Sequence, residues 1–151
     1  MKPKCILVYT SMTGNTEAMA EAIAEGLALG GCNPVQIPMY KAHARQLHDY
    51  DCILIGSYTW GDGEVPDEAM DFYEELSGIS LTGKKGAVFG SCDSNYLEYG
   101  AAVDIFEQKL RQLGAEIIEQ GLKVDQAPKS RDIETCRSFG ARFAQKSCTF
   151  G

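Results

Sequence analysis

A short polar segment, residues 10–16, concentrates hydrogen-bonding groups between an apolar run and a helical pattern. Four of its seven side chains carry hydroxyls, one carries a carboxamide, and Gly14 allows close approach to the backbone. The first N–H groups of a helix lack partners within the helix and carry partial positive charge. One hydroxyl would be enough for an ordinary helix cap, so this number of donors in one turn predicts a phosphate site.

The motifs that are missing narrow the kind of phosphate compound. The sequence contains neither GxxxxGK[ST] nor GxGxxG, and it has no Lys or Arg between Cys5 and Tyr40. A nucleoside triphosphate with Mg²⁺ normally requires the lysine of the first motif, and a dinucleotide requires the glycines of the second. A single phosphate held by neutral donors therefore favours a mononucleotide.

Two later loops combine aromatic residues with small polar ones. Residues 58–63 contain Trp60, the only tryptophan of the chain, between residues that offer it little apolar surface. Gly61 and Gly63 permit positive φ and a peptide that can flip. Residues 91–100 contain two further aromatic side chains among Ser, Asp and Asn. Loops of this composition on either side of a phosphate site predict that a flat ring is bound between aromatic side chains.

The elements that must position these loops alternate between apolar runs and helical patterns. The runs are short, and those at residues 5–9, 52–56 and 86–90 are apolar enough to be buried on both faces, as in a parallel sheet with helices on both sides. In such sheets a ligand lies beyond the carboxyl ends of the strands, which is where the three loops fall. We expect strands at residues 4–10, 34–39, 51–57, 85–92 and 115–124, the last one broken at Gly121. We expect helices at 13–29, 67–76, 101–113 and 133–145, with a short helical turn at 42–47. The helices should face inward at Met19, Ala20, Ile23, Leu27, Ala69, Phe72, Tyr73, Leu76, Val103, Phe106, Leu110 and Leu113.

Composition excludes several classes of protein. The chain has 151 residues, enough for one domain (1–151), and 44% hydrophobic with 23% charged residues is typical of a globular protein. A net charge of −7 argues against binding nucleic acid or an anionic membrane. Nine acidic residues and no Lys or Arg lie between Arg45 and Lys84. This stretch serves either solubility alone or docking of a basic partner.

The cysteines and the N-terminus indicate a reducing compartment. The six cysteines form no CxxC and, with only two histidines, no zinc pattern, so no metal site is expected. Cys5 and Cys52 lie within apolar strands and are expected in the core. The first four residues lead directly into an apolar run without the features of a signal peptide, and no run is long enough to span a membrane. We therefore expect a cytoplasmic protein with reduced thiols.

The residues around the three loops resemble those of the short-chain flavodoxins. Residues 7–23, LVYTSMTGNTEAMAEAI, resemble the flavodoxin signature throughout, and residues 59–63 and 90–99 resemble the second and third flavin loops of that family. The similarity extends over essentially the whole chain, and the last strand lacks a long insertion. The resemblance implies a flavodoxin-like, three-layer, doubly wound α/β fold. Its five-stranded parallel sheet would have the order 2-1-3-4-5, and it would bind FMN tightly but not covalently.

The resemblance also implies which residues contact FMN. Residues 11–16 would hold the phosphate, with Met12 contributing only its backbone N–H. Trp60 would cover the inner face of the ring and Tyr96 the outer face, with Tyr99 as the competing candidate. The expected cofactor-binding residues are Ser11, Met12, Thr13, Gly14, Asn15, Thr16, Tyr58, Thr59, Trp60, Gly61, Asp62, Gly63, Ser91, Cys92, Asp93, Tyr96, Tyr99 and Gly100.

The remaining contacts implied are with the ribityl chain and the ring edge. Thr59 would lie near the ribityl chain. The main chain of Gly61 and Asp62 would meet flavin N5. Asp93 and the backbone of Gly100 would meet the pyrimidine end.

The function expected from these residues is low-potential electron transfer. FMN accepts two electrons one at a time, and nearby carboxylates would oppose the negative charge added with the second, which favours the semiquinone/hydroquinone couple. No catalytic residues are expected, because the loops contain no nucleophile with a base. An FMN-dependent oxidoreductase, such as a quinone reductase, is the alternative. A phosphoryl-accepting signalling domain would need acidic residues where Tyr9 and Thr10 stand, so we discount it.

The partners implied are redox proteins with basic docking faces. The donor would be of the ferredoxin/flavodoxin–NADP reductase type, and the acceptor a P450, a desaturase or a reductase. Neither nucleic acid nor membrane is expected as a partner, and the protein should be a monomer.

Overall fold

The computed structural model describes residues 3–60, 63–95 and 99–147, in which strands and helices alternate along the chain. The first half contains β1 (Cys5–Tyr9), α1 (Asn15–Leu29), β2 (Val35–Pro38), the 3₁₀ helices η1 (Met39–Lys41) and η2 (Ala44–Asp49), β3 (Cys52–Gly56) and α2 (Asp67–Leu76). The second half contains β4 (Lys85–Cys92), α3 (Ala101–Gln112), β5 (Glu116–Ile117), β6 (Leu122–Asp125) and α4 (Ser130–Ser147).

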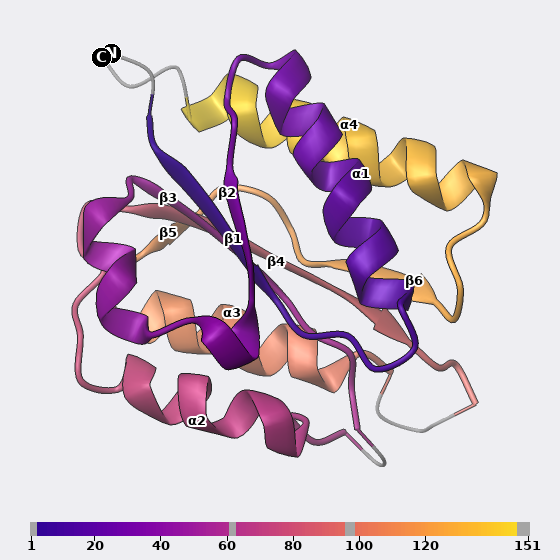
Figure 1. Ribbon diagram of the computed structural model, residues 1–151, viewed down its shortest axis with the longest axis horizontal. Coiled ribbons are helices and arrows are strands. Elements are labelled where there is room, and N and C mark those ends of the chain that lie inside the picture. Colours follow the sequence, from indigo (N-terminus) through magenta and orange to yellow (C-terminus); the bar gives the residue numbers. More distant parts are fainter. Residues whose placement is uncertain (1–2, 61–62, 96–98, 148–151) are drawn as a thin grey trace.

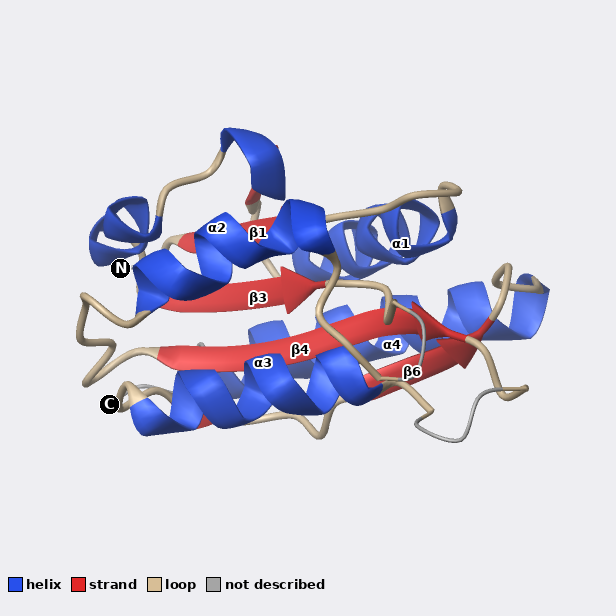
Figure 2. Ribbon diagram, turned by 90° about the horizontal axis from the view of Figure 1, so that it is seen from below, coloured by secondary structure: helices blue, strands red, loops and turns tan. Residues whose placement is uncertain are grey.

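One parallel sheet forms the middle layer. Its strand order is β2-β1-β3-β4-β5, which confirms the order expected from the sequence. Figure 1 shows α1 and α4 on one face and α2 and α3 on the other, and Figure 2 shows the same layers edge-on. The expected three-layer, doubly wound α/β class is therefore confirmed.

The fifth strand is broken, as expected, and its two halves pair with different parts of β4. β5 lies beside Lys85 and Gly86, whereas β6 lies beside residues 89–92. Between them the backbone N–H of Gly121 donates to Glu107 of α3 at 3.1 Å. In the same gap the buried Glu119 carboxylate accepts from Arg142 and Lys146 of α4. The break lets polar groups between the half-strands reach a helix on each side of the sheet.

The core consists of two apolar clusters, one on each face. Along β1, Cys5 and Leu7 belong to the cluster under α1 and α4, whereas Ile6 and Val8 belong to the one under α2 and α3. This alternation follows from the period of two in a strand. The expected inward positions of the helices are buried, except that Tyr73 and Leu113 are partly exposed.

Helix ends differ from expectation where side chains or glycine set the boundary. α1 begins at Asn15 rather than residue 13, because Gly14 has φ 88° and interrupts the helical path. α4 begins at Ser130, three residues earlier than expected, with the Asp132 carboxylate accepting the N–H of Lys129 at 2.9 Å. The expected bounds of α2 and β4 are confirmed.

α1 and α4 pack closely because each carries a glycine at their crossing. A Cβ added to Gly26 would lie 2.0 Å from the Arg137 carbonyl oxygen, and one added to Gly140 would lie 2.2 Å from that of Ile23. Any side chain at either position would separate the two helices.

Five of the six cysteines lie within the described residues, and all five are buried. Cys5, Cys32, Cys52, Cys92 and Cys136 are buried thiols, with Cys5 and Cys52 in the core as expected, while Cys148 lies outside the described residues. Within those residues no helix is both long and apolar enough to cross a membrane.

Candidate functional site

The β1–α1 turn presents backbone donors at the carboxyl edge of the sheet. Ser11 Oγ accepts the N–H groups of Gly14 at 3.1 Å and Glu17 at 3.2 Å, so its own hydroxyl hydrogen remains available to donate. Four other N–H groups donate to no described residue, although helix-start N–H groups are normally satisfied. They belong to Met12, Thr13, Asn15 and Thr16. These four N–H groups are therefore available as donors at this turn.

Thr16 has a different side-chain role from the rest of the turn. Its hydroxyl is buried and lies 2.7 Å from Ser91 Oγ at the end of β4. The Ser91 N–H also points to Thr16 Oγ1, at 3.4 Å. The Thr16 side chain therefore fastens the start of α1 to the sheet, while its backbone N–H is left for a ligand.

The loop after β3 is a tight turn that exposes an indole. Trp60 and Glu64 exchange two backbone hydrogen bonds, of 2.8 and 2.9 Å, and Gly63 has φ 104°. The Trp60 residue is 47% exposed, unusually high for the largest apolar side chain. Gly61 and Asp62, expected to meet the flavin, lie outside the described residues.

Glu68 joins the ends of two strands beneath this loop. Its Oε1 accepts the Thr10 hydroxyl at 2.8 Å and the Tyr58 hydroxyl at 2.7 Å. Burial and the Glu68 carboxylate raise the pKa of Tyr58, so its hydroxyl stays protonated and continues to donate. Glu68 thereby fixes the relative position of the first and second loops.

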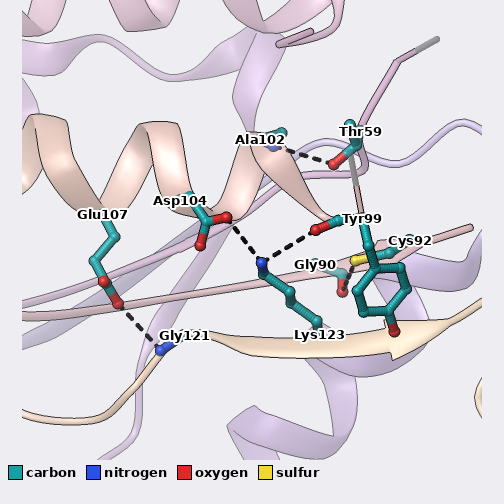
Figure 3. A network of polar contacts seen from close by, with 9 residues as sticks. All are labelled: Thr59, Gly90, Cys92, Tyr99, Ala102, Asp104, Glu107, Gly121 and Lys123. Atoms are coloured by element: carbon teal, nitrogen blue, oxygen red, sulfur yellow. Dashed lines mark hydrogen bonds and ion pairs between the residues drawn. The ribbon is translucent and has the colours of Figure 1, made fainter. Parts of the chain in front are cut away.

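Thr59 connects the second loop to the third. Its Oγ1 accepts the N–H of Ala102 at 3.1 Å and caps α3 (Figure 3). Gly100, directly before α3, has φ 66°. Thr59, which was expected near the ribityl chain, lines the cavity and also positions α3.

The third loop is held from both of its ends. Ser94 donates through its N–H at 3.0 Å and its hydroxyl at 2.8 Å to the Asp125 carboxylate, which lowers the pKa of Asp125. At the other end, Lys123 Nζ donates to the Tyr99 carbonyl at 3.1 Å and to Asp104 at 2.8 Å (Figure 3). Tyr96 lies outside the described residues.

Cys92 lies beneath this loop without the character of a nucleophile. Burial raises its pKa to about 11, so it is a neutral thiol at pH 7. Its Sγ faces the Gly90 carbonyl oxygen at 3.5 Å (Figure 3). Cys92 therefore packs against the site.

A cavity of about 390 Å³ opens between the three loops. Nine of the expected site residues and one other line it: Met12, Thr13, Asn15, Tyr58, Thr59, Trp60, Ser91, Cys92, Asp93 and Gln126. Ser11, Gly14 and Thr16 complete the turn at one end, while Tyr99 and Gly100 belong to the third loop. None of the lining residues is a Lys or Arg, and the described residues contain no group of His, Cys, Asp or Glu arranged for a metal.

Sequence reasoning missed four residues that build the site. Gln126, with φ 59°, lines the cavity directly after β6, and a search of every strand end, including the fifth, would have found it. Glu68, Lys123 and Asp125 act through loops distant in sequence, and no local pattern indicates those contacts.

The cavity suits a phosphorylated, flat cofactor. One end offers unpartnered N–H groups and hydroxyls, which match a phosphate, and the other offers an exposed indole, which matches an aromatic ring. Fold and cavity together are those of a doubly wound α/β protein whose cofactor site lies at the carboxyl edge of the sheet.

Comparison with known proteins gives the family. Residues 7–140 match the flavodoxin family model. The chain is 41% identical over 146 residues to probable flavodoxin 2 of Bacillus subtilis, covering 95% of this chain and 96% of that protein. It is 36% identical to the flavodoxin of Maridesulfovibrio salexigens, covering 95% and 98%. The crystal structure of oxidised flavodoxin 1 from Bacillus cereus is 46% identical, with a TM-score of 0.91, over 94% and 97% of the two chains. The chain belongs to the flavodoxin family.

It follows that the protein binds FMN and carries electrons, exchanging them with other redox proteins. The resemblance found in the sequence is thereby confirmed for family, fold, cofactor and general function. Longer proteins also contain a related segment, such as a nitric oxide reductase of Moorella thermoacetica, 28% identical over 96% of this chain but 36% of that protein.

Proposed function

We propose that this chain is a low-potential, one-electron carrier with no substrate of its own, and that the cavity between the three loops is its FMN site. The observation that carries this proposal is a set of four N–H groups in the β1–α1 turn that have no partner among the described residues, together with the half-exposed Trp60 that lines the same cavity. Those two features fit the two chemically different ends of FMN. The site residues proposed are those expected from the sequence, with Gln126 added.

The β1–α1 turn would bind the phosphate without a cationic side chain. The donors would be the backbone N–H groups of Met12, Thr13, Asn15 and Thr16. The Ser11 hydroxyl would also donate, because its oxygen already accepts two N–H groups and only its hydrogen is left for the phosphate. Donors fixed in a turn need no reorganisation on binding, and hydrogen bonds to an anion are about twice as strong as neutral ones. The phosphate would be held tightly by a site that is neutral itself.

Aromatic side chains would cover the ring. Trp60 projects from the second loop and is the proposed inner cover. We retain Tyr96 as the proposed outer cover and Tyr99 as the competing one. Lys123 donates to the Tyr99 carbonyl, and its Nζ lies 5.9 Å from the centroid of the Tyr99 ring.

Bound FMN supplies the capacity to accept two electrons one at a time. The contribution of the protein is its charge. Glu64, Asp67, Glu68 and Asp71 are exposed carboxylates on or beside the second loop. At an effective dielectric of about 20, two like charges about 8 Å apart repel by roughly 2 kcal/mol, before screening by salt. Several such carboxylates would lower the potential of the second electron by ~100 mV or more, since ~59 mV is a tenfold change.

The same carboxylates would form the docking face. The first turns of α2, which follow the second loop in the chain, carry the exposed residues Asp67, Glu68 and Asp71, and the sequence has no Lys or Arg between residues 45 and 84. We propose donors of the ferredoxin/flavodoxin–NADP reductase type and an acceptor such as a P450, a desaturase or a reductase, each presenting a basic face. We place the protein in the cytoplasm as a monomer.

Spectroelectrochemical titration of the FMN-loaded protein tests this function. Two separate one-electron waves are expected, the second at the lower potential by roughly 100 mV or more. A single two-electron wave would contradict the proposal.

Turnover measurements separate the carrier from the alternative, an FMN-dependent oxidoreductase such as a quinone reductase. Cys92, the thiol that lines the described cavity, is neutral and buried, so the carrier proposal gives it no role as a nucleophile. The isolated protein should show no steady-state oxidation of NAD(P)H by quinone. Addition of a ferredoxin–NADP reductase type donor should start reduction of the flavin. Turnover by the isolated protein would favour the alternative.

A further inference from the structure

Three buried thiols gather at the amino edge of the sheet, opposite the cavity. Cys5 begins β1 and Cys52 begins β3, and the strand register places them side by side. Cys32 follows the end of α1, and its Sγ lies 2.9 Å from Cys5 Sγ. All three residues are at most 3% exposed. The flavin site uses none of them.

Cys32 is better placed than Cys52 to bond with Cys5. The Cys5–Cys32 sulfur separation is about 0.9 Å longer than a disulfide bond of about 2.05 Å. Cys52 also hydrogen-bonds with Cys5 across two parallel strands spaced about 4.8 Å apart, and this contact raises the pKa of Cys5. The 2.9 Å contact joins Cys5 to Cys32, so we take Cys32 as the partner in a disulfide.

The backbones at both sulfurs are already fixed. Cys5 lies within the β1 ladder between β2 and β3. The Cys32 N–H donates to the Leu27 carbonyl at 2.8 Å, after a turn in which Gly31 has φ 91°. Closing the bond would bring the two sulfur atoms nearer by about 0.9 Å.

We propose that Cys5 and Cys32 are a site of reversible oxidation, forming an intramolecular disulfide when the protein meets hydrogen peroxide. One thiol attacks the peroxide, breaking the O–O bond to give a sulfenic acid and water. The second thiol then attacks that sulfur, forming the S–S bond and releasing a second water. Two thiols lose two electrons and two hydrogens in total, and peroxide is reduced to two waters.

The disulfide would join the end of α1 to the start of β1. Because both residues are buried, and hydrogen bonding with Cys52 together with burial raises the pKa of Cys5, the reactive thiolate forms only on local opening. Oxidation should therefore be slow beside that of an exposed thiol. The cross-link closes a loop between residues separated by 27 positions, which restricts the unfolded chain. Oxidised protein should therefore be harder to unfold.

Peptide mapping without reduction, on FMN-loaded protein, tests the site. After peroxide treatment we expect loss of two hydrogens in mass and one cross-linked peptide that joins Cys5 to Cys32. The melting temperature should rise by roughly 5–10 °C and return after dithiothreitol. Added oxygen atoms at either cysteine, an unchanged mass, or a cross-link between other cysteines would each overturn the proposal.

Matched variants separate the disulfide from general oxidation. In a Cys148→Ser background, Cys5→Ala and Cys32→Ala should abolish both the mass loss and the thermal shift. Cys52→Ala, an equally buried control, should keep both. The peptide map of the unmodified protein decides whether the Cys5–Cys32 disulfide forms. The test therefore still works if one of the variants folds poorly. The flavin spectrum should be the same before and after oxidation, so failure here is independent of the proposed electron-transfer function.

Discussion

The buried hydroxyl of Thr16 lies 2.7 Å from that of Ser91, joining the first turn of α1 to the end of β4. The contact spans 75 positions in the chain and connects the turn that would bind phosphate to the loop that would border the ring. Both residues are at most 7% exposed, so the two hydroxyls are largely shielded from bulk water. The geometry of the two halves of the site therefore depends on this pair.

Thr16→Val should destabilise the apoprotein by about 1–3 kcal/mol, because the Ser91 hydroxyl is left without its partner. FMN affinity should fall as well, since the turn loses its anchor. Urea unfolding and fluorescence titration with FMN measure the two effects. The double variant, Thr16→Val with Ser91→Ala, should lose less free energy of unfolding than the two single variants lose together. Thr135→Val, on an exposed face of α4, is the control and should change neither quantity. Additive single costs would show that the two hydroxyls do not interact.

Gly140→Ala should destabilise the protein although alanine is the better helix former. The added Cβ would lie 2.2 Å from the Ile23 carbonyl oxygen of α1, and overpacking of this kind costs about 1–3 kcal/mol, more than the ~1 kcal/mol gained in helix propensity. Gly78→Ala is the matched control, because its Cβ would make an ordinary 3.6 Å contact. Chemical denaturation of both variants should rank Gly140→Ala well below Gly78→Ala. Equal stabilities would mean that α1 and α4 do not pack at this distance.

The Glu119 carboxylate should make stability depend on pH in the acid range. Burial alone would raise its pKa, but hydrogen bonds and charges from Lys146 and Arg142 outweigh burial and lower it. A carboxyl group with a lowered pKa in the folded state contributes stability above its unfolded value, near 4.5, and loses it as the pH falls through the folded value. Glu119→Gln should therefore be less stable than the unmodified protein at pH 7, by about 1 kcal/mol.

Denaturation midpoints measured between pH 3 and 7 test this pH dependence. The difference in denaturation midpoint between the unmodified protein and Glu119→Gln should become smaller as the pH falls below 4.5. Glu116→Gln, whose Lys85 partner is 3.9 Å away at an exposed position, should follow the unmodified protein throughout. A gap that stays constant down to pH 3 would contradict the assigned pairing.

Asp67→Asn combined with Asp71→Asn should slow association with a ferredoxin–NADP reductase type donor. Both residues are exposed on α2 in the stretch without cations, and charges of this kind act mainly on the association rate. We expect a several-fold loss at low salt that shrinks as salt is added, measured by stopped-flow reduction. Glu21→Gln, exposed on α1 at the other face of the sheet, should leave the rate unchanged. If both charge changes have the same effect, then net charge rather than a docking face controls association.

Much of the fold follows from local patterns in the sequence, and the differences have local causes. The bounds of α2 and β4 were predicted correctly, because an acidic start and an apolar period define the helix, and an apolar centre at residues 87–89 defines the strand. The start of α4 was predicted too late. Residues 130–132 are polar, and only the Asp132 cap, a hydrogen bond visible in three dimensions, makes them helical.

The site was predictable in position but less so in side-chain roles. The rule for parallel sheets located three loops, and nine of their residues line one cavity. The sequence could not indicate that Thr16 and Thr59 use their hydroxyls to fasten α1 and α3, because their partners are 75 and 43 positions away. Lys123 was missed for the same reason, since its contacts with Tyr99 and Asp104 arise only when β6 lies beside α3.

Binding of FMN and riboflavin to the apoprotein, compared by fluorescence titration, tests the central claim most directly. The two ligands share the ring and differ in the phosphate, which the four unpartnered N–H groups of the β1–α1 turn would receive. FMN should bind at least about 100-fold more tightly than riboflavin, since each hydrogen bond to an anion contributes about 1.5 kcal/mol or more. Equal affinities would contradict the assignment of this turn as the phosphate site.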